Sequence, residues 1–217
     1  MTTAAETSAD RVWLARAVLV LLDPRPVFAA LRDDSDDAAR ARQEPVLAIV
    51  GLAGIASILW TSVAGRVMDD PAFDGLVVAV WAFIGGAFYG LFAYFALGAA
   101  LFAGLQAAGS LGSYRRARHL LAFACAPLAL SLVVWPVRVA VYGGDVFRTG
   151  GSDHGPGNAA FVVVELAFVA WALGLLVVGT RTLHAWTWAR TLEGISLAVA
   201  IAALAVVGVY FVHLGLD

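Results

Sequence analysis

Five long apolar segments constrain the fold of this chain more than any other feature. They cover residues 45–65, 76–108, 117–142, 158–180 and 191–214. A helix needs about 20 apolar residues to cross the hydrocarbon core of a bilayer, and each segment reaches that length. Of the 217 residues, 61% are hydrophobic and only 14% are charged, whereas about a quarter of a soluble domain is charged. The pattern predicts an all-α, polytopic membrane protein built as a five-transmembrane-helix bundle.

The second segment allows two interpretations because it is unusually long. A helix over residues 76–108 would be about 50 Å long at 1.5 Å per residue, which exceeds one span but is short for two spans and a turn. It is either one long helix or a helix broken at Gly85-Gly86. Small residues let membrane helices approach closely. They recur at helical spacing on two segments: Ala53, Ser57 and Thr61 on the first, and Ala82, Gly86 and Gly90 on the second.

The arginines favour a single second span. Basic residues collect in the cytoplasmic loops of membrane proteins. With one span over 76–108, eleven of the 14 basic residues lie on the side of the N-terminus. We therefore expect a multi-pass protein of the cell membrane, with its N-terminus in the cytoplasm and its C-terminus outside. The eleven are Arg11, Arg16, Arg25, Arg32, Arg40, Arg42, Arg115, Arg116, Arg118, Arg181 and Arg190, and the other three are Arg66, Arg138 and Arg148.

The first 44 residues differ from the rest of the chain. We expect a cytoplasmic N-terminal region over 1–44 and a membrane domain over 45–217. The apolar stretch from Val12 to Leu22 is too short to span, and Pro24 and Pro26 interrupt it. It predicts an amphipathic helix at the membrane interface, with a solvated helix packed on the membrane domain as the alternative. Residues 33–44 are charged and expected to be solvated.

No motif for catalysis or cofactor binding is present in the sequence. We find no metalloprotease, serine hydrolase, P-loop or dinucleotide-binding pattern. The single cysteine, Cys125, excludes an intrachain disulfide. We therefore expect no enzymatic activity, catalytic residue, cofactor or metal, and no binding of nucleic acid.

Two ionisable residues lie inside apolar segments, where such residues are rare. Arg138 and Glu165 fall at similar depths below the outer ends of consecutive segments, because about five and about seven residues separate them from those ends. We predict a structural ion pair between them, with a polar transport pathway as the alternative. Pro127 and Pro136 should kink the third span.

A second group of residues is basic and lies at the expected cytoplasmic side. Each basic residue near an anionic leaflet contributes about 1 kcal/mol of attraction. Trp186 and Trp188 suit the interface, where amphipathic rings settle. The group either sets the topology or binds anionic lipid headgroups or a partner. Its members are Arg115, Arg116, Arg118, Arg181, His184 and Arg190.

Three stretches resemble the Yip-domain membrane proteins, a family named for interaction with Ypt/Rab GTPases. The first is the proline- and phenylalanine-containing entry at 23–32. The second is the glycine-rich turn at 109–116 with its aromatic and basic residues, which leads to the Ala-Cys-Ala-Pro sequence at 124–127. The third is the loop at 179–190, in which Ala185 replaces the family's usual glycine and Trp186 and Trp188 are additions.

The resemblance implies a five-helix membrane bundle with a cytoplasmic N-terminus and no catalytic residues. Eukaryotic members are linked to vesicle trafficking, but the Arg- and Ala-rich composition looks prokaryotic, so that role is not transferred. The leading hypothesis is a non-enzymatic scaffold or adaptor that organises the bilayer or partner proteins. The alternative is a small transporter or channel subunit that uses Arg138 and Glu165. The expected partners are the lipid bilayer with its anionic headgroups, and a membrane protein or a second copy of the chain.

Overall fold

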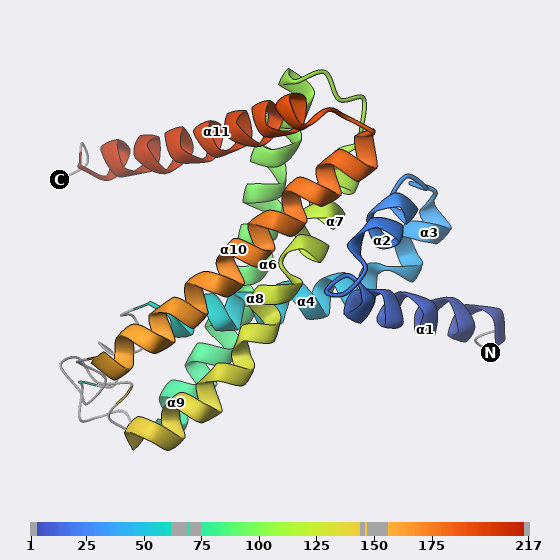
Figure 1. Cartoon of the computed structure of the whole chain (residues 1–217). Coiled ribbons are helices and arrows are strands. Elements are labelled where there is room, and N and C mark those ends of the chain that lie inside the picture. The colour runs from blue at the N-terminus through green and yellow to red at the C-terminus, as the bar shows by residue number, and fades with distance from the viewer. Residues whose placement is uncertain (1–3, 62–68, 70–74, 144–145, 147–155, 215–217) are drawn as a thin grey trace.

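The computed structural model describes residues 4–61, 69, 75–143, 146 and 156–214, and every regular element in these residues is helical. Figure 1 shows α6 running through the middle of the molecule, with α11 crossing its C-terminal end and with α10 and α11 diverging from one corner. The elements are α1 (Ala4–Leu19), α2 (Pro24–Ala30), α3 (Asp36–Ala41), α4 (Gln43–Leu59), α6 (Gly75–Ala107), α7 (Tyr114–Ala124), α8 (Ala126–Leu130), the 3-10 turn η1 (Ser131–Val133), α9 (Val134–Tyr142), α10 (Pro156–His184) and α11 (Trp188–Leu214).

Four helical stretches in the described residues are long and apolar enough to cross a membrane. The chain is therefore a multi-pass membrane protein, although the first expected span is shorter than predicted. Helix α4 has 17 residues, at the lower end of the range for a span, and residues 62–65 of the expected segment lie outside the described residues. The four stretches are Ala79–Ala107, Tyr114–Tyr142, Gly157–His184 and Trp188–Val212.

Helix α6 is continuous over 33 residues, so the alternative of a break at Gly85-Gly86 is wrong. Gly85 has open space around its α-carbon, whereas Gly86 lies against the backbone of Ile55 on α4. A helix can accommodate such glycines without kinking when a neighbouring helix packs on them, because the missing side chain then serves close approach.

Glycines on both helices bring α4 and α6 into backbone contact. A β-carbon on Gly54 would meet the backbone of Gly86 and Gly90, and one on Gly90 would meet the Val50 carbonyl. The predicted strip on α6 is therefore in contact, but its closest partner on α4 is Gly54. Ser57 instead donates a hydrogen bond to the Ala53 carbonyl of its own helix, at 2.8 Å.

Alanine at the contact glycines should destabilise the bundle. We expect Gly54→Ala and Gly90→Ala each to lower the free energy of unfolding by about 1–3 kcal/mol, because the added methyl group overlaps a facing backbone. Gly51 and Gly85 have nothing within 4 Å of an added β-carbon and serve as controls. Alanine there should raise the free energy of unfolding by about 0.5–1 kcal/mol. Thermal unfolding in detergent would measure the difference, and equal effects in the two pairs would contradict the contact.

The third span is divided into shorter helices where the sequence has prolines. Helix α7 ends before Cys125, and α8 begins at Ala126 with Pro127 in its first turn. After η1, α9 carries Pro136 in its first turn. A proline is tolerated in a first turn because its missing N–H would have no partner within the helix. The prolines therefore mark interruptions of the span.

The N-terminal region shares the core of the membrane helices. Trp13 is 6% exposed and its ring lies 5.7 Å from that of Phe123. Phe28 of α2 is fully buried and lies against Gly179 of α10. Residues 20–22 form a turn after α1, so the predicted helix over Val12 to Leu22 begins and ends earlier. The apolar side chains that face outward from this stretch are Val12, Leu14, Val18, Leu19 and Leu22.

The expectation that residues 33–44 are solvated is wrong in part. Arg42 has no exposed surface, and its guanidinium lies 5.5 Å above the Trp13 ring. Arg42 also donates a hydrogen bond to the Asp33 carbonyl at 2.8 Å and lies 3.7 Å from the Asp34 carboxylate. Burial lowers the pKa of Arg42, while the nearby carboxylates oppose that shift. Charged residues of this stretch are thus part of the packed structure.

Candidate functional site

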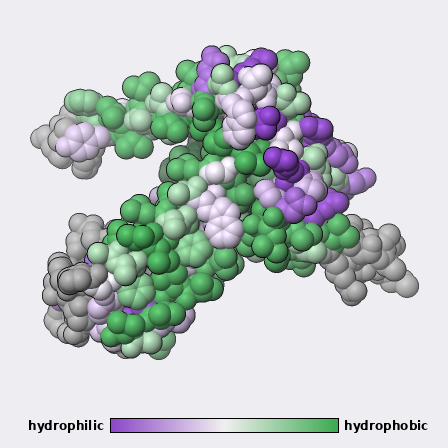
Figure 2. Space-filling model, in the orientation of Figure 1, coloured by the Kyte–Doolittle hydropathy of each residue, from purple (hydrophilic) through white to green (hydrophobic). Residues whose placement is uncertain are grey.

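The predicted basic residues gather at one end of the bundle, which we call the polar end. Here the C-termini of α6 and α10 meet the N-termini of α7 and α11, and α2 and α3 pack beside them. Figure 2 shows hydrophilic residues concentrated at this end and a hydrophobic surface over most of the remaining helices. All six predicted basic residues lie at the polar end, but they differ in what they contact.

Arg190 closes the C-terminus of α6. Its Nε donates to the Ala108 carbonyl at 2.8 Å and its Nη2 to the Gly109 carbonyl at 3.4 Å. Gly109 has a φ of 90°, a conformation that glycine adopts without strain. The amide of Ser110 then donates to the Leu105 carbonyl at 2.9 Å. A helix C-terminus carries unpaired carbonyls and partial negative charge, so a guanidinium stabilises it.

Arg32 closes the C-terminus of α10 in the same way. Its guanidinium donates to the carbonyls of Leu183, at 3.3 Å, and of Thr182. Arg116 in turn donates to the carbonyl of Arg32 at 2.9 Å. These contacts attach the N-terminal region to the polar end through backbone carbonyls, with no carboxylate involved.

Arg115 joins α7 to the acidic residues of the N-terminal region. Its Nε lies 3.1 Å from the Asp34 carboxylate and its Nη1 lies 2.7 Å from that of Asp36. Ser113, the N-cap of α7, accepts from the Arg116 amide at 3.1 Å and donates to Asp34. Burial alone would raise the pKa of Asp34, but the hydrogen bonds from Ser113 and Arg115 outweigh it and lower the pKa below 3.8. We call Asp34, Asp36, Ser113 and Arg115 together the acidic latch.

Weakening the acidic latch should loosen the N-terminal region. We expect Asp34→Asn to increase protease cleavage between α2 and α3, because the amide loses the charge that Arg115 and Ser113 stabilise. A carboxylate with a lowered pKa contributes stability above its unfolded value and loses it as the pH falls through the folded value. Acidification below about pH 4 should therefore act like the substitution.

The control is Asp37→Asn, since the Asp37 side chain is 98% exposed and lies 3.8 Å from Arg40, whose side chain is 78% exposed. Surface pairs of this kind contribute little. Timed proteolysis with mass spectrometry would compare the variants. Cleavage that rises equally in both would show that the latch does not hold the region.

Tryptophan rings cover two of the predicted arginines. The guanidinium carbon of Arg181 lies 4.5 Å from the ring centre of Trp188, and that of Arg190 lies 4.7 Å from Trp186. His184 stacks on Trp186 at 4.6 Å. Such contacts are worth about 0.5–1 kcal/mol where exposed. They hold the turn between α10 and α11 in one conformation.

Arg118 lies against three aromatic rings. Its guanidinium carbon lies 4.5 Å from the ring of Tyr114, 4.7 Å from that of Phe95 and 5.2 Å from that of Tyr94. Its aliphatic stem lies against Gly98, where a β-carbon would overlap it. Within the described residues, no carboxylate lies within salt-bridge distance of Arg118. Among the described residues, its positive charge therefore has neither a counter-charge nor a helix terminus beside it.

The structure also brings Arg138 and Glu165 together. Nη1 of Arg138 lies 3.0 Å from Oε1 of Glu165, and the side chains are 10% and 13% exposed. Nη2 of Arg138 lies 3.0 Å from the Asn158 side-chain oxygen. The guanidinium sits 5.1 Å from the Trp135 ring and 5.9 Å from the Phe161 ring. The pair therefore joins α9 to α10 in a largely apolar setting.

Removing one member of this pair should destabilise the protein more than exchanging both members. We expect Arg138→Ala and Glu165→Ala each to lower the free energy of unfolding by about 3 kcal/mol, because the remaining charge stays buried without its partner. The exchange Arg138→Glu with Glu165→Arg should recover part of that loss. Folded yield and thermal stability in detergent would measure all three variants. If both single variants keep the parent stability, the pair does not support the fold.

Several partners in these sites are not identifiable from the sequence pattern. They lie far along the chain from the residues that they contact, as Asp34 does from Arg115, or in stretches without a motif, as Asn158 does. The acidic run at 33–37 was the available signal for the latch, because its charge is opposite to that of the basic group expected on the same side of the membrane. The partners that were missed are Arg32, Asp34, Asp36, Tyr94, Phe95, Ser113 and Asn158.

A family model of the Yip1 domain matches residues 18–210 of the chain. The chain belongs to the Yip1 domain family. The match covers α2 to α11 and most of the described residues, so it includes both the polar end and the Arg138–Glu165 pair. Comparisons with the curated proteins and with the solved structures gave no match.

The loop at 179–190 of this Yip1 domain contains a residue with a strained backbone conformation. Ala185 follows the last residue of α10 with a φ of 53°, and the Trp186 amide donates to the Arg181 carbonyl at 3.3 Å. This is the helix ending that glycine usually provides. Alanine therefore occupies a left-handed position at which its β-carbon crowds the backbone.

Glycine at position 185 should stabilise the protein. We expect Ala185→Gly to raise the free energy of unfolding by about 1 kcal/mol, because it removes the strain of a left-handed alanine. Ala203→Gly, at an exposed position within α11, is the matched control and should lower it by about 0.5–1 kcal/mol. Thermal unfolding would compare the variants. A loss of stability in both would mean that the conformation at 185 carries no strain.

Proposed function

We propose that this Yip1 domain protein is a non-enzymatic scaffold or adaptor of a prokaryotic cell membrane, which associates laterally with membrane-protein partners. The observation that supports this role is the exposure of α11. Its first half packs on α6, where Gly104 lies against Gly194 and Ala198. Its second half presents large apolar side chains on all sides. They are Leu204, Val206, Val207, Val209, Tyr210, Phe211 and Val212.

The proposal includes a topology of five spans with the N-terminus in the cytoplasm. Helix α4 would be the shortest span, and its glycine contact with α6 would hold it within the bundle. The polar end would then face the cytoplasm, in agreement with the tendency of basic residues to remain on that side. The outward apolar side chains of α1 would lie in the interface.

We do not extend the proposal to transport. The Arg138 guanidinium is held between Glu165 and Asn158 and is flanked by two aromatic rings. A transport site must release and rebind its charged groups, whereas this arrangement fixes the guanidinium from several directions. The geometry supports a structural tie between helices.

Site-specific photocrosslinking in native membranes would test the scaffold role. A crosslinking amino acid at Phe211 should give discrete protein adducts in addition to lipid adducts. The same amino acid at Phe88, which is 70% exposed on α6, controls for general contact with lipid and neighbouring proteins. Discrete adducts at Phe211 that exceed those at Phe88 would support lateral association. Lipid adducts alone at Phe211 would contradict it.

A further inference from the structure

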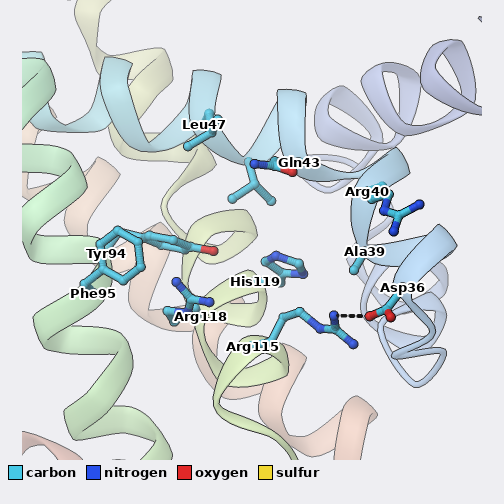
Figure 3. A pocket seen from close by; sticks show the side chains of 11 residues that line it. Asp36, Ala39, Arg40, Gln43, Leu47, Tyr94, Phe95, Arg115, Arg118 and His119 are labelled. Carbon is cyan, nitrogen blue, oxygen red and sulfur yellow. Dashed lines mark hydrogen bonds and ion pairs between the residues drawn. The ribbon is translucent and has the colours of Figure 1, made fainter.

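A cavity of about 430 Å³ opens between α3, α4, α6 and α7 at the polar end. This volume falls in the range of ligand sites, about 300–1,000 Å³. In Figure 3, the Tyr94 hydroxyl, the Arg118 guanidinium and the His119 ring point into the same space from α6 and α7. Gln43 borders it from α4. The cavity is therefore lined by hydrogen-bond donors that come from three separate elements.

One positive charge in this cavity, that of Arg118, has no carboxylate partner among the described residues, although Asp36 also lines the cavity. Among its arginines, Arg115 is held by the acidic latch and Arg40 pairs with Asp37 at the surface. Arg118 retains an uncompensated charge, and its Nε is buried without a hydrogen-bond partner among the described residues. The cavity thus offers positive charge and unused donor capacity in one place.

His119 provides a second, independent indication of a ligand. It is only 7% exposed, and its Nδ1 has no hydrogen-bond partner within the part of the chain that the structure describes. A buried polar atom without a partner costs about 1–3 kcal/mol, so such atoms are usually satisfied by water or by a ligand. His119 lies directly beside Arg118, at the wall of the cavity.

An apolar groove lies beside the cavity, along the same helices. A second hollow of about 110 Å³ lies between α4, α6, α7 and α8, and Tyr94 lines both. Its walls include Leu97, Leu121 and Leu128, and it follows the seam at which Gly54 meets Gly90. At the mouth of the polar cavity, Leu47 and Phe95 are 45% and 44% exposed. A polar hollow suited to an anion therefore lies next to an apolar hollow suited to part of an acyl chain, with Tyr94 between them.

We propose that this composite site binds one anionic phospholipid. Its phosphate lies at Arg118 and His119, with Gln43 and Tyr94 as further donors, and an acyl chain lies in the groove between α4 and α6. A guanidinium suits this role because it donates several hydrogen bonds to phosphate oxygens while its face stays on aromatic rings. Basic pockets between membrane helices are known to recognise acidic headgroups. The inference depends on the membrane location and not on the scaffold role.

The full-length protein in nanodiscs of phosphatidylcholine with a minor fraction of phosphatidylglycerol provides the test. Native mass spectrometry after release into neutral detergent should detect one retained phosphatidylglycerol. We expect Arg118→Gln to weaken retention about fivefold or more, the effect of one basic residue at a membrane surface. Arg25→Gln is the matched control, because it removes an equal charge from an exposed position outside the cavity. Equal retention in the two variants would overturn the proposal.

Two further variants distinguish a loss of lipid binding from a loss of folding, and binding of a phospholipid from binding of a free anion. Gln43→Glu places a carboxylate at the cavity from an exposed position and should weaken retention with the folded yield unchanged. Ala93→Phe narrows the groove and should weaken phospholipid retention, whereas the affinity of the lipid-free protein for inorganic phosphate should stay unchanged. If inorganic phosphate displaces the lipid at concentrations close to those of phosphatidylglycerol itself, the ligand is a free anion and the lipid assignment is wrong.

Discussion

The last carbonyls of two long helices need hydrogen-bond donors at the polar end, and arginine guanidiniums supply them to both helices. Arg190 bonds to the carbonyls that end α6, and Arg32 bonds to those that end α10. Unpaired carbonyls near a membrane are costly, so these contacts fix where each helix stops. The turns into α7 and α11 follow from that position. The N-terminal region is held there because one of the two arginines belongs to it.

The sequence predicted the elements better than the contacts between them. Long apolar segments and proline positions are local signals, so the four long apolar stretches of the described residues and the interruptions near Pro127 and Pro136 could be placed. The proximity of Arg138 to Glu165 was also predictable, since a short connection makes consecutive helices neighbours. The pairing of Asp34 with Arg115 and the aromatic contacts of Arg118 were not, because they depend on how distant segments pack. Residues 33–44 look solvated for the same reason, although Arg42 is buried.

One type of interaction recurs at different depths of this molecule. A guanidinium is placed against an aromatic face and its edge is left to donate hydrogen bonds, as at Arg138 with Trp135 and at Arg190 with Trp186. Arginine suits this use because its charge is spread over a plane and is weakly hydrated. At Arg138 the edge meets Glu165, and at Arg190 it meets helix carbonyls. At Arg118 the same arrangement leaves the edge directed at a cavity.

The contact between Arg32 and α10 has a consequence for biosynthesis. Arg32 and Thr182 are 150 residues apart, and a ribosome adds about 5–20 residues per second. The N-terminal region therefore waits roughly 8–30 s for its docking partner. During that time Phe28, fully buried in the finished protein, has no α10 to cover it. The nascent chain consequently offers an apolar binding site to chaperones or to the insertion machinery, and the emergence of α10 ends that interval.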